Sequence, residues 1–387
     1  KARSGTATEL TPEQQAKIEQ LESIGYVSGS QAPRSPRSLT VYDPERAHPG
    51  LNLYTSGHVP GAVLMDMEGR ELHTWELGFQ AVWGDEGETL EQFDTLKDFW
   101  RRVALFPNGD LLAIFEGVGI FKVDKDSNLL WKNRNGAHHD LKVLSNGDIL
   151  VLTRKAHILP RLHPTEPILE DFITRLDANG REIESLSLIE CLENSPHGEI
   201  LKAPNLGTGD IFHTNSLFLV DGTFADRVPW LQAGYILTSL RNVHALAVID
   251  PVRRSAVRAW TGAFRMQHDP TVLENGNILL FDNQGGRGGK ARVVEFNPID
   301  SRLVWFYAGT PELPLESPTL GTARRLANGN TLITESDFGR ALEVAPDKSV
   351  VWEFHNPHRV KDGEYIATIF EMQRLPLDFP VSWARGR

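Results

Sequence analysis

Three similar stretches of the sequence, HHDLKVLSNG, HTNSLFLVDG and HDPTVLENG, begin with histidine. His139 and His268 each lie seven residues before the Asn of an Asn-Gly pair, which gives them equivalent positions. His213 lies eight residues before Asp221, so its equivalence is approximate. A single histidine at a strand end is more often structural, but three at one repeated position favour a shared functional site. His138, beside His139, is expected to face the other way if both lie in a regular strand.

An arginine accompanies these histidines, since Arg241 follows an apolar run in ILTSLRNVHALAVID. Imidazole and guanidinium groups together bind and polarise a sulfate or phosphate, and a neutral imidazole can attack its central atom. Histidine is also a common zinc ligand, but a nearby arginine would repel the cation and no HExxH spacing is present. The sequence therefore favours anion chemistry and predicts no metal. The alternative role for Arg241 is a structural salt bridge.

A repeated hairpin must position these residues. Four hairpins share an Asn-Gly turn, which supplies the positive φ angles of a tight turn: VALFPNGDLLAIF (103–115), LKVLSNGDILVL (141–152), TVLENGNILLF (271–281) and RRLANGNTLIT (324–334). A second hairpin follows each one, and four strands in roughly 40 to 55 residues is the spacing of a β-propeller blade. The sequence thus predicts five complete blades, which begin near Arg101, His138, His213, His268 and Thr322.

Both ends of the repeated region supply part of a sixth blade. Residues 62–77 have the pattern of outer strands, and residues 365–375 have the pattern of an inner strand. Joining them predicts an all-β fold, a six-bladed β-propeller of four-stranded blades closed by both chain ends, which removes exposed sheet edges. The first strand of each blade lines the central channel of a propeller, so the histidines and Arg241 are expected to converge there.

Residues 1–40 differ from residues 41–387, which we assign to the propeller. ELTPEQQAKIEQLESIGYVSGS predicts one helix with Thr11 as N-cap, Pro12 in the first turn and Gly25 as the C-terminal stop. A linker rich in Pro, Ser and Arg follows it. We expect the helix to dock on the propeller or on a partner. Membership of a larger, membrane-associated complex is therefore an alternative.

The composition of the 387 residues excludes several functions. A formal charge of −11 gives no reason to expect nucleic acid, because phosphate binding needs clustered Lys and Arg. No run approaches about 18 apolar residues, so no transmembrane segment is predicted. Cys191 is the single cysteine, which excludes an internal disulfide. GGRGGKA (285–291) lacks the first Gly and the final Ser or Thr of a phosphate loop, so no nucleotide cofactor is expected.

Four separated elements resemble the bacterial arylsulfate sulfotransferases: HHDLKVLSNGDILVL, the stretch from HTNSLFLVDG to GYILTSLRNVHALAVID, QHDPTVLENGNILLFDN and GTARRLANGNTLI. The resemblance covers roughly residues 51–375. That family comprises six-bladed propellers that move a sulfuryl group between phenols without a nucleotide donor. It implies the same activity here, no cofactor, an aryl sulfate and a phenol as small-molecule partners, and a periplasmic or extracellular protein.

The resemblance also implies a role for each matching residue. His268 matches the nucleophile that forms a covalent sulfo-histidine intermediate. His139, His213 and Arg241 match the residues that hold the sulfuryl oxygens and handle the phenolic proton. The expected reaction therefore has two half-reactions and ping-pong kinetics.

Three further residues, which match the family less closely, complete the predicted site. Asn215 and Thr322 match polar residues around the sulfate, and His138 replaces His139 if the register slips by one. The sequence departs from better-known members in its single cysteine and in lacking their N-terminal β-domain, so its oligomeric state stays open.

Two other interpretations remain. A non-catalytic propeller would serve as a scaffold or binding subunit of a larger complex, with the N-terminal helix docked on a partner. A quinone-dependent propeller dehydrogenase usually needs a calcium site and a larger set of repeats, and the sequence shows neither.

Overall fold

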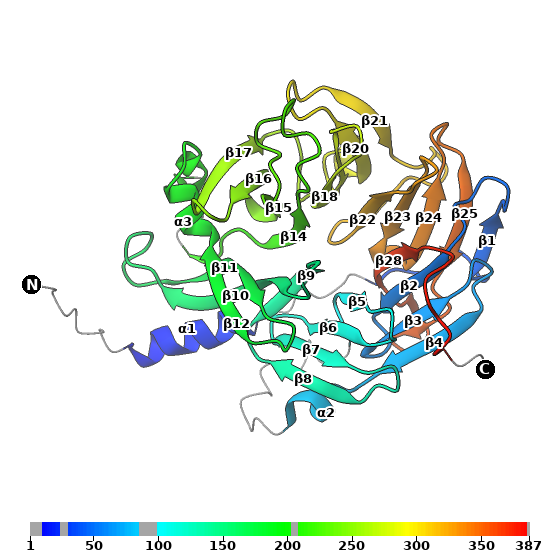
Figure 1. The fold of residues 1–387 in the computed structure, drawn as a ribbon, viewed down its shortest axis with the longest axis horizontal. Helices are drawn as coiled ribbons and strands as arrows, with labels where there is room; N and C mark the ends of the chain where they lie inside the picture. The colour runs from blue at the N-terminus through cyan, green and yellow to red at the C-terminus, as the bar shows by residue number, and fades with distance from the viewer. Residues whose placement is uncertain (1–9, 24–29, 85–98, 203–207, 385–387) are drawn as a thin grey trace, which may run out of the picture.

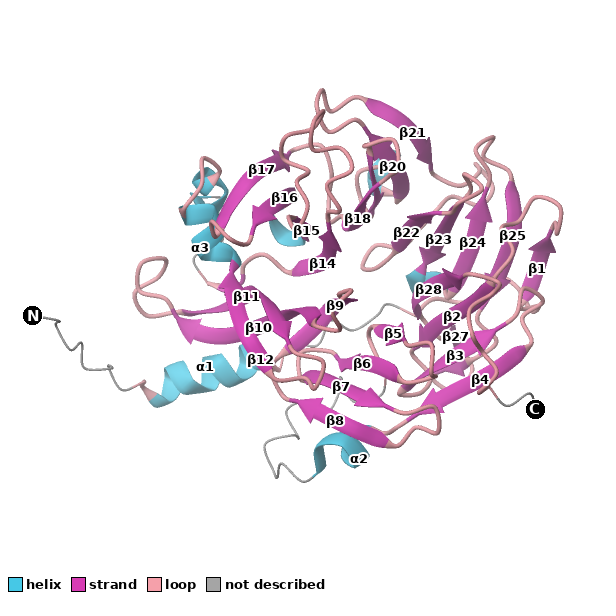
Figure 2. Cartoon of the chain, viewed as in Figure 1, coloured by secondary structure: helices cyan, strands magenta, loops and turns pink. Residues whose placement is uncertain are grey.

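The structure of the chain, a computed structural model, describes residues 10–23, 30–84, 99–202 and 208–384. Six mainly antiparallel sheets surround a central axis, with one strand of each sheet innermost (Figure 1). Helices are few and lie mainly at the periphery (Figure 2). The prediction of an all-β, six-bladed β-propeller is therefore confirmed.

We number the blades 1 to 6 from the N-terminus. Blade 1 contains β28 (Ile369–Leu375), β2 (Leu51–Ser56), β3 (Gly61–Met65) and β4 (Glu71–Glu76). Blade 2 contains β5 (Val103–Leu105), β6 (Leu111–Phe115), β7 (Gly119–Val123) and β8 (Leu129–Asn133). Blade 3 contains β9 (Ala137–Val143), β10 (Ile149–Ile158), β11 (Pro167–Leu176) and β12 (Glu182–Ser187), with the short β13 (Gly209–Asp210) beside β11.

The other three blades follow in chain order. Blade 4 contains β14 (Thr214–Leu219), β15 (Ile236–Leu240), β16 (Ala245–Asp250) and β17 (Ser255–Thr261). Blade 5 contains β18 (His268–Val272), β19 (Ile278–Asp282), β20 (Arg292–Phe296) and β21 (Leu303–Tyr307). Blade 6 contains β22 (Thr322–Arg325), β23 (Thr331–Glu335), β24 (Arg340–Val344) and β25 (Val350–His355).

Short elements connect the strands. Among the described residues, the α-helices are α1 (Pro12–Glu22), α2 (Phe79–Trp83) and α3 (Leu188–Glu193). The short 3₁₀ helices are η3 (Gly198–Lys202), η4 (Arg241–Val243), η5 (Arg287–Gly289) and η6 (Ser336–Phe338). The two-residue strands β26 (Arg359–Val360) and β27 (Tyr365–Ile366) pair with each other before β28.

Both chain ends close blade 1, as predicted, but the strand that pairs with β28 is β2, which lies outside the fragments at residues 62–77 and 365–375. The C-terminal strand β28 pairs antiparallel with β2, from Leu51 opposite Leu375 to Ser56 opposite Ile369. The innermost strand of this blade thus comes from one end of the chain and the outer strands from the other (Figure 1).

Tryptophans in the fourth strands of four blades, counted from the axis, connect neighbouring blades. Each donates its indole N–H to a backbone carbonyl of the next blade. The pairs are Trp75 with Gly109 (3.0 Å), Trp260 with Pro298 (3.2 Å), Trp305 with Pro346 (3.4 Å) and Trp352 with Met67 (2.9 Å). These side chains therefore belong to the packing between blades.

The N-terminal segment lies against the propeller at two places. Helix α1 begins with a capping box formed by Thr11 and Gln14, and its Ile18 packs against Ala156 and Leu169 of blade 3. The helix ends at Glu22, and the expected stop at Gly25 lies outside the described residues.

The linker that follows the helix contributes to blade 6. Arg34 forms ion pairs with Glu335 (3.0 Å) and Glu316 (2.9 Å). Strand β1 (Leu39–Tyr42) pairs with β25 and gives the blade a fifth strand, so the sheet extends slightly before residue 41. Within the described part of the chain, no helix has the length and apolar character needed to cross a membrane.

Candidate active site

The candidate histidines stand at irregular points of the first strands. In blade 3, the ladder between β9 and β10 leaves His139 and Asp140 unmatched, and in blade 5 the irregularity falls at Asp269 and Pro270. Such bulges change the direction of a side chain and occur often beside active sites. His139 and His213 also have left-handed φ angles of 51° and 50°. This conformation costs about 1 kcal/mol or more in a residue other than glycine, and residues strained in this way often cluster at functional sites.

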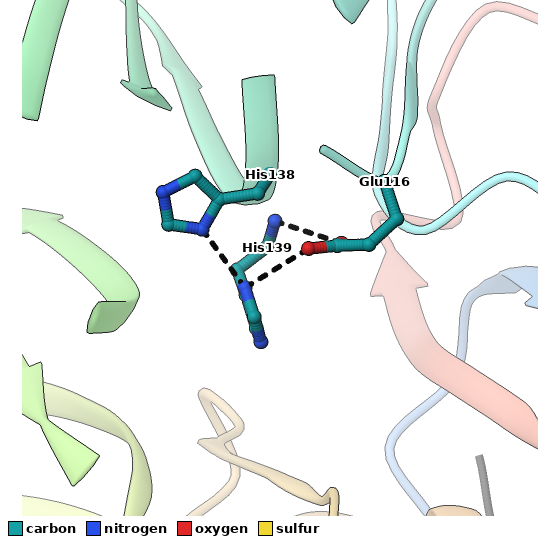
Figure 3. A group of neighbouring side chains, drawn as sticks. All are labelled: Glu116, His138 and His139. Atoms are coloured by element: carbon teal, nitrogen blue, oxygen red, sulfur yellow. Dashed lines mark hydrogen bonds and ion pairs between the residues drawn. The ribbon is translucent and has the colours of Figure 1, made fainter. Parts of the chain in front are cut away.

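The expectation that His138 faces away from His139 is wrong. The Nδ1 atoms of the two rings lie 2.9 Å apart (Figure 3), because the left-handed backbone at His139 breaks the regular alternation. His138 lies opposite Leu152, and His268 lies opposite Phe281, which has the same place in the second strand of its blade. The strand ladder thus makes His138 the counterpart of His268, whereas the count from the turn selects His139.

Glu116 of blade 2 holds His139 of blade 3. Its carboxylate accepts the backbone N–H of His139 at 3.1 Å and lies 3.2 Å from the ring Nδ1 (Figure 3). Glu116, His138 and His139 are buried, and their potential ligand atoms lie within 4.8 Å of one another. However, the Arg101 guanidinium lies 3.4 Å from the same carboxylate, and its charge opposes a cation. These side chains therefore fit proton handling beside an anion better than a metal centre.

A second carboxylate approaches His138 from its own blade. Asp171 on β11 lies 3.5 Å from Nε2 of His138 and accepts the backbone N–H of Thr214 at 2.8 Å. Burial, together with the charge of nearby Asp210, raises the pKa of Asp171, while burial and Arg154 lower the pKa of His138 well below its usual value. The two buried groups therefore lie close together, without a hydrogen bond between these atoms among the described residues.

His213 connects the histidines of blade 3 to Arg241. Its ring centroid lies 5.0 Å from that of His139, and its Nδ1 lies 2.7 Å from Asp210. Arg241 begins η4, directly after β15, and its Nη1 donates to Asn242 Oδ1 at 3.1 Å. Asn242 in turn donates to the backbone carbonyl of Asp210 at 2.9 Å. The segment of Arg241 and Asn242 therefore helps to position both the His213 imidazole, through Asp210, and the Arg241 guanidinium.

His268 is almost fully buried and presents one nitrogen to acceptors. Its Nδ1 lies 2.7 Å from Oδ1 of Asn283 and 3.1 Å from the backbone carbonyl of Met266. Its Nε2 is buried and has no hydrogen-bond partner among the described residues. Burial and the charges of Arg241 and Arg101 lower the pKa of His268 well below 6.5. The ring is therefore neutral at pH 7, and both cations lie close enough to influence it.

The two remaining predicted residues make structural hydrogen bonds. Asn215 donates to the backbone carbonyl of Gln267 at 2.9 Å and so fixes the residue before His268. Thr322 donates its hydroxyl to Thr334 Oγ1 at 2.8 Å. Asn215 is thus tied directly to the candidate nucleophile, whereas the Thr322 hydroxyl is directed into its own sheet.

Several polar residues of the site were not predicted. Glu116, Arg241 and Asn283 each follow directly after the second strand of a blade, at the ends of β6, β15 and β19. Arg241 was predicted because it follows an apolar run, and the corresponding positions of two other blades hold Glu116 and Asn283, which were not predicted. Asp171 and Asp210 lie on β11 and β13 and carry no such signal.

The buried histidines make stability depend on pH. Burial and Arg241 lower the pKa of His213 to about 4, although Asp210 opposes the shift. The unfolded chain, with an ordinary histidine pKa of about 6.5, binds more protons between these values. The free energy of unfolding therefore contains a term from His213 that is fully present above pH 6.5. This term is lost as the pH falls toward 4, by up to about 1.4 kcal/mol per pH unit.

We expect His213→Gln to reduce the slope of unfolding free energy against pH between about pH 4.5 and 6.5. Urea unfolding at several pH values measures that slope. An unchanged slope would show that His213 is protonated as readily in the folded protein as in the unfolded chain.

Comparisons with known proteins bear on this site. A family model described as Arylsulfotransferase (ASST) matches residues 102–357. No curated protein matches the chain. Among solved structures, a protein of unknown function from Bacteroides caccae is 14% identical, with a TM-score of 0.53 over 84% of this chain and 98% of that one. A streptogramin B lyase is 12% identical, with a TM-score of 0.47 over 87% and 88% of the two chains. The likeness to the Bacteroides caccae structure shows the fold alone.

Proposed function

Because the chain belongs to the arylsulfotransferase family, we propose that it transfers a sulfuryl group from an aryl sulfate to a phenol through a covalent intermediate on His268, without a nucleotide donor. One observation carries this proposal. His268 is neutral and buried, with Nδ1 against two acceptors and Nε2 lacking a hydrogen-bond partner among the described residues. A proton on Nδ1 leaves the lone pair on Nε2, which is the state of a nucleophile.

In the first half-reaction, Nε2 of His268 attacks the sulfur of the aryl sulfate. The N–S bond forms, the bond from sulfur to the aryl oxygen breaks, and its electron pair leaves with that oxygen. Transfer of this kind depends mainly on in-line positioning and on stabilising charge at the peripheral oxygens. Arg241 and Arg101, whose charges already influence the His268 ring, are suited to stabilise those oxygens.

His139 and His213 are the candidates for proton transfer to the departing phenolate. Burial and neighbouring positive charges keep both rings neutral in the absence of substrate. A bound sulfate ester adds negative charge and favours their protonated forms. The protonated ring gives its proton to the phenolate and, once neutral, accepts the proton of the incoming phenol in the second half-reaction.

A labelling experiment tests the proposal. The protein is incubated with p-nitrophenyl sulfate, first alone and then with phenol. We expect nitrophenol release, an added mass of about 80 Da on a peptide that contains His268, and loss of that mass on adding phenol. Absence of release with a panel of phenols, together with absence of a labelled peptide, would refute it.

The position of α1 bears on the scaffold alternative. The apolar side chain that the helix buries, Ile18, packs against the chain's own blade 3, and Lys17 pairs with Glu166 at 3.0 Å. The helix thus has a docking site within the chain, and no feature of it favours a partner over the propeller.

A further inference from the structure

We propose that Asn283 is a positioning residue that holds the proton on Nδ1 of His268 and thereby keeps the reactive lone pair on Nε2. This inference rests on the proposed function. Asn283 follows β19 and is 1% exposed. It lies within the blade of His268, and its Oδ1 is 2.7 Å from the ring Nδ1.

The orientation of the Asn283 amide is fixed by the neighbouring backbone. Its Nδ2 donates to the carbonyls of Ser317 at 2.5 Å and Leu320 at 2.8 Å, both in the connection before β22. Carbonyl oxygens only accept hydrogen bonds, so rotating the amide by 180° would place Oδ1 against two acceptors. Oδ1 must therefore face His268.

This orientation selects one tautomer of His268. Met266 contributes a second acceptor, its backbone carbonyl, at 3.1 Å from Nδ1. A lone pair on Nδ1 would face two oxygens without a proton between them, and a buried polar contact of this kind without a hydrogen bond is unfavourable. The tautomer with hydrogen on Nδ1 avoids that cost. The ring can keep the same hydrogen bond before and after Nε2 becomes sulfated.

The neutral amide also suits the second half-reaction. An aspartate at this position would favour a positively charged ring, which would hinder the first attack by protonating Nε2. It would also stabilise the positively charged sulfo-imidazole and slow release of the sulfuryl group. The amide orients the ring without a full negative charge, so burial and the charges of Arg241 and Arg101 keep the His268 pKa low.

Nitrogen-15 NMR of the histidine-labelled wild-type protein tests the tautomer directly, with His268→Gln to assign the signal. We expect a neutral His268 ring with hydrogen on Nδ1 at pH 7. Hydrogen on Nε2 would overturn the proposal. Because this readout needs no substrate, it remains decisive even if the wild-type protein transfers no sulfuryl group, a result that would count against the proposed function alone.

Two variants test the consequence for transfer. Asn283→Ala is expected to lower kcat about 10- to 100-fold, with little change in KM, and to give mixed tautomers. Asn283→Asp is expected to move the acidic limb of the pH–rate profile upward by about one pH unit or more and to prolong the sulfo-enzyme.

Asn356→Asp is the matched control, because Asn356 is also buried and donates to a backbone carbonyl, that of Ala367, at 2.9 Å. Its pH profile and the His268 tautomer are expected to match those of the wild type. Unchanged kcat and pH profiles in both Asn283 variants would overturn the positioning role. Where an Asn283 variant does not fold, the wild-type NMR result decides.

Discussion

Replacing His268 by alanine is expected to lower sulfuryl transfer by at least about 10³-fold and to remove the added mass of about 80 Da from the protein. The reason is the arrangement of the ring, whose Nε2 has no hydrogen-bond partner among the described residues while Nδ1 is held by Asn283 and Met266. Loss of a nucleophile stops both half-reactions, so the burst of nitrophenol should disappear together with steady turnover. Stopped-flow absorbance and intact-protein mass measure the two effects.

His73→Gln provides the matched control, because His73 lies on the outer strand β4, where its Nε2 contacts the backbone carbonyl of Lys125 at 2.7 Å. Its transfer rate and labelling are expected to equal those of the wild type. If His268→Ala kept the burst and carried the label on His138 or His139, the nucleophile would be one of those residues. The reacting histidine would then lie on the side of the channel where Glu116 contacts His139.

Local sequence signals were sufficient to predict the propeller. Each Asn-Gly pair marks a hairpin turn, although only its glycine has a positive φ angle, and the repeat of these turns defined the blades. The closure of blade 1 by both chain ends followed from joining the fragments at residues 62–77 and 365–375, but β2, the strand that pairs with β28, lies outside both fragments and was not predicted. Strand β1 had no repeat to reveal it, because Leu39–Tyr42 simply adds to the outer edge of β25.

The candidate site was only partly predictable. A bulge lengthens β9 relative to β18, so a count from the turn aligns His139 with His268, whereas the ladder aligns His138 with it. The presence of a bulge depends on tertiary pairing, which a residue count does not detect. Asp171 and Asp210 reach the histidines only through the folded arrangement of blade 3.

The acidic neighbour of His268 proves to be structural. Asp269 accepts the backbone N–H of Ala323 at 3.0 Å and pairs with Arg324, so it joins blade 5 to blade 6. Asp140 makes the corresponding contact in blade 3, where it accepts the N–H of Leu217 at 2.7 Å. These carboxylates lie inside the ring of blades, so the positive charges that balance them must come from side chains inside the ring.

Replacing Arg102 by methionine is expected to destabilise the fold by about 3–5 kcal/mol at pH 8, because the change leaves buried carboxylates without their cation. Arg102 lies 3.3 Å from Asp140 of blade 3, pairs with Glu371 of blade 1 and donates to the carbonyl of His139 at 3.1 Å. All three charged side chains are less than a tenth exposed. Urea unfolding measures the loss of stability.

The pH dependence of that loss separates an electrostatic cause from a packing defect. Without Arg102, the pKa values of Asp140 and Glu371 are expected to rise above their values in the unfolded chain. Protonation then relieves the buried charge, so the destabilisation shrinks from pH 8 to pH 5. Arg46→Met, which breaks an exposed pair with Asp347 (2.8 Å), is expected to cost less than about 1 kcal/mol at either pH. A loss for Arg102→Met that is equal at both pH values would mean that the arginine acts through packing, and that the carboxylates of the channel do not depend on its charge.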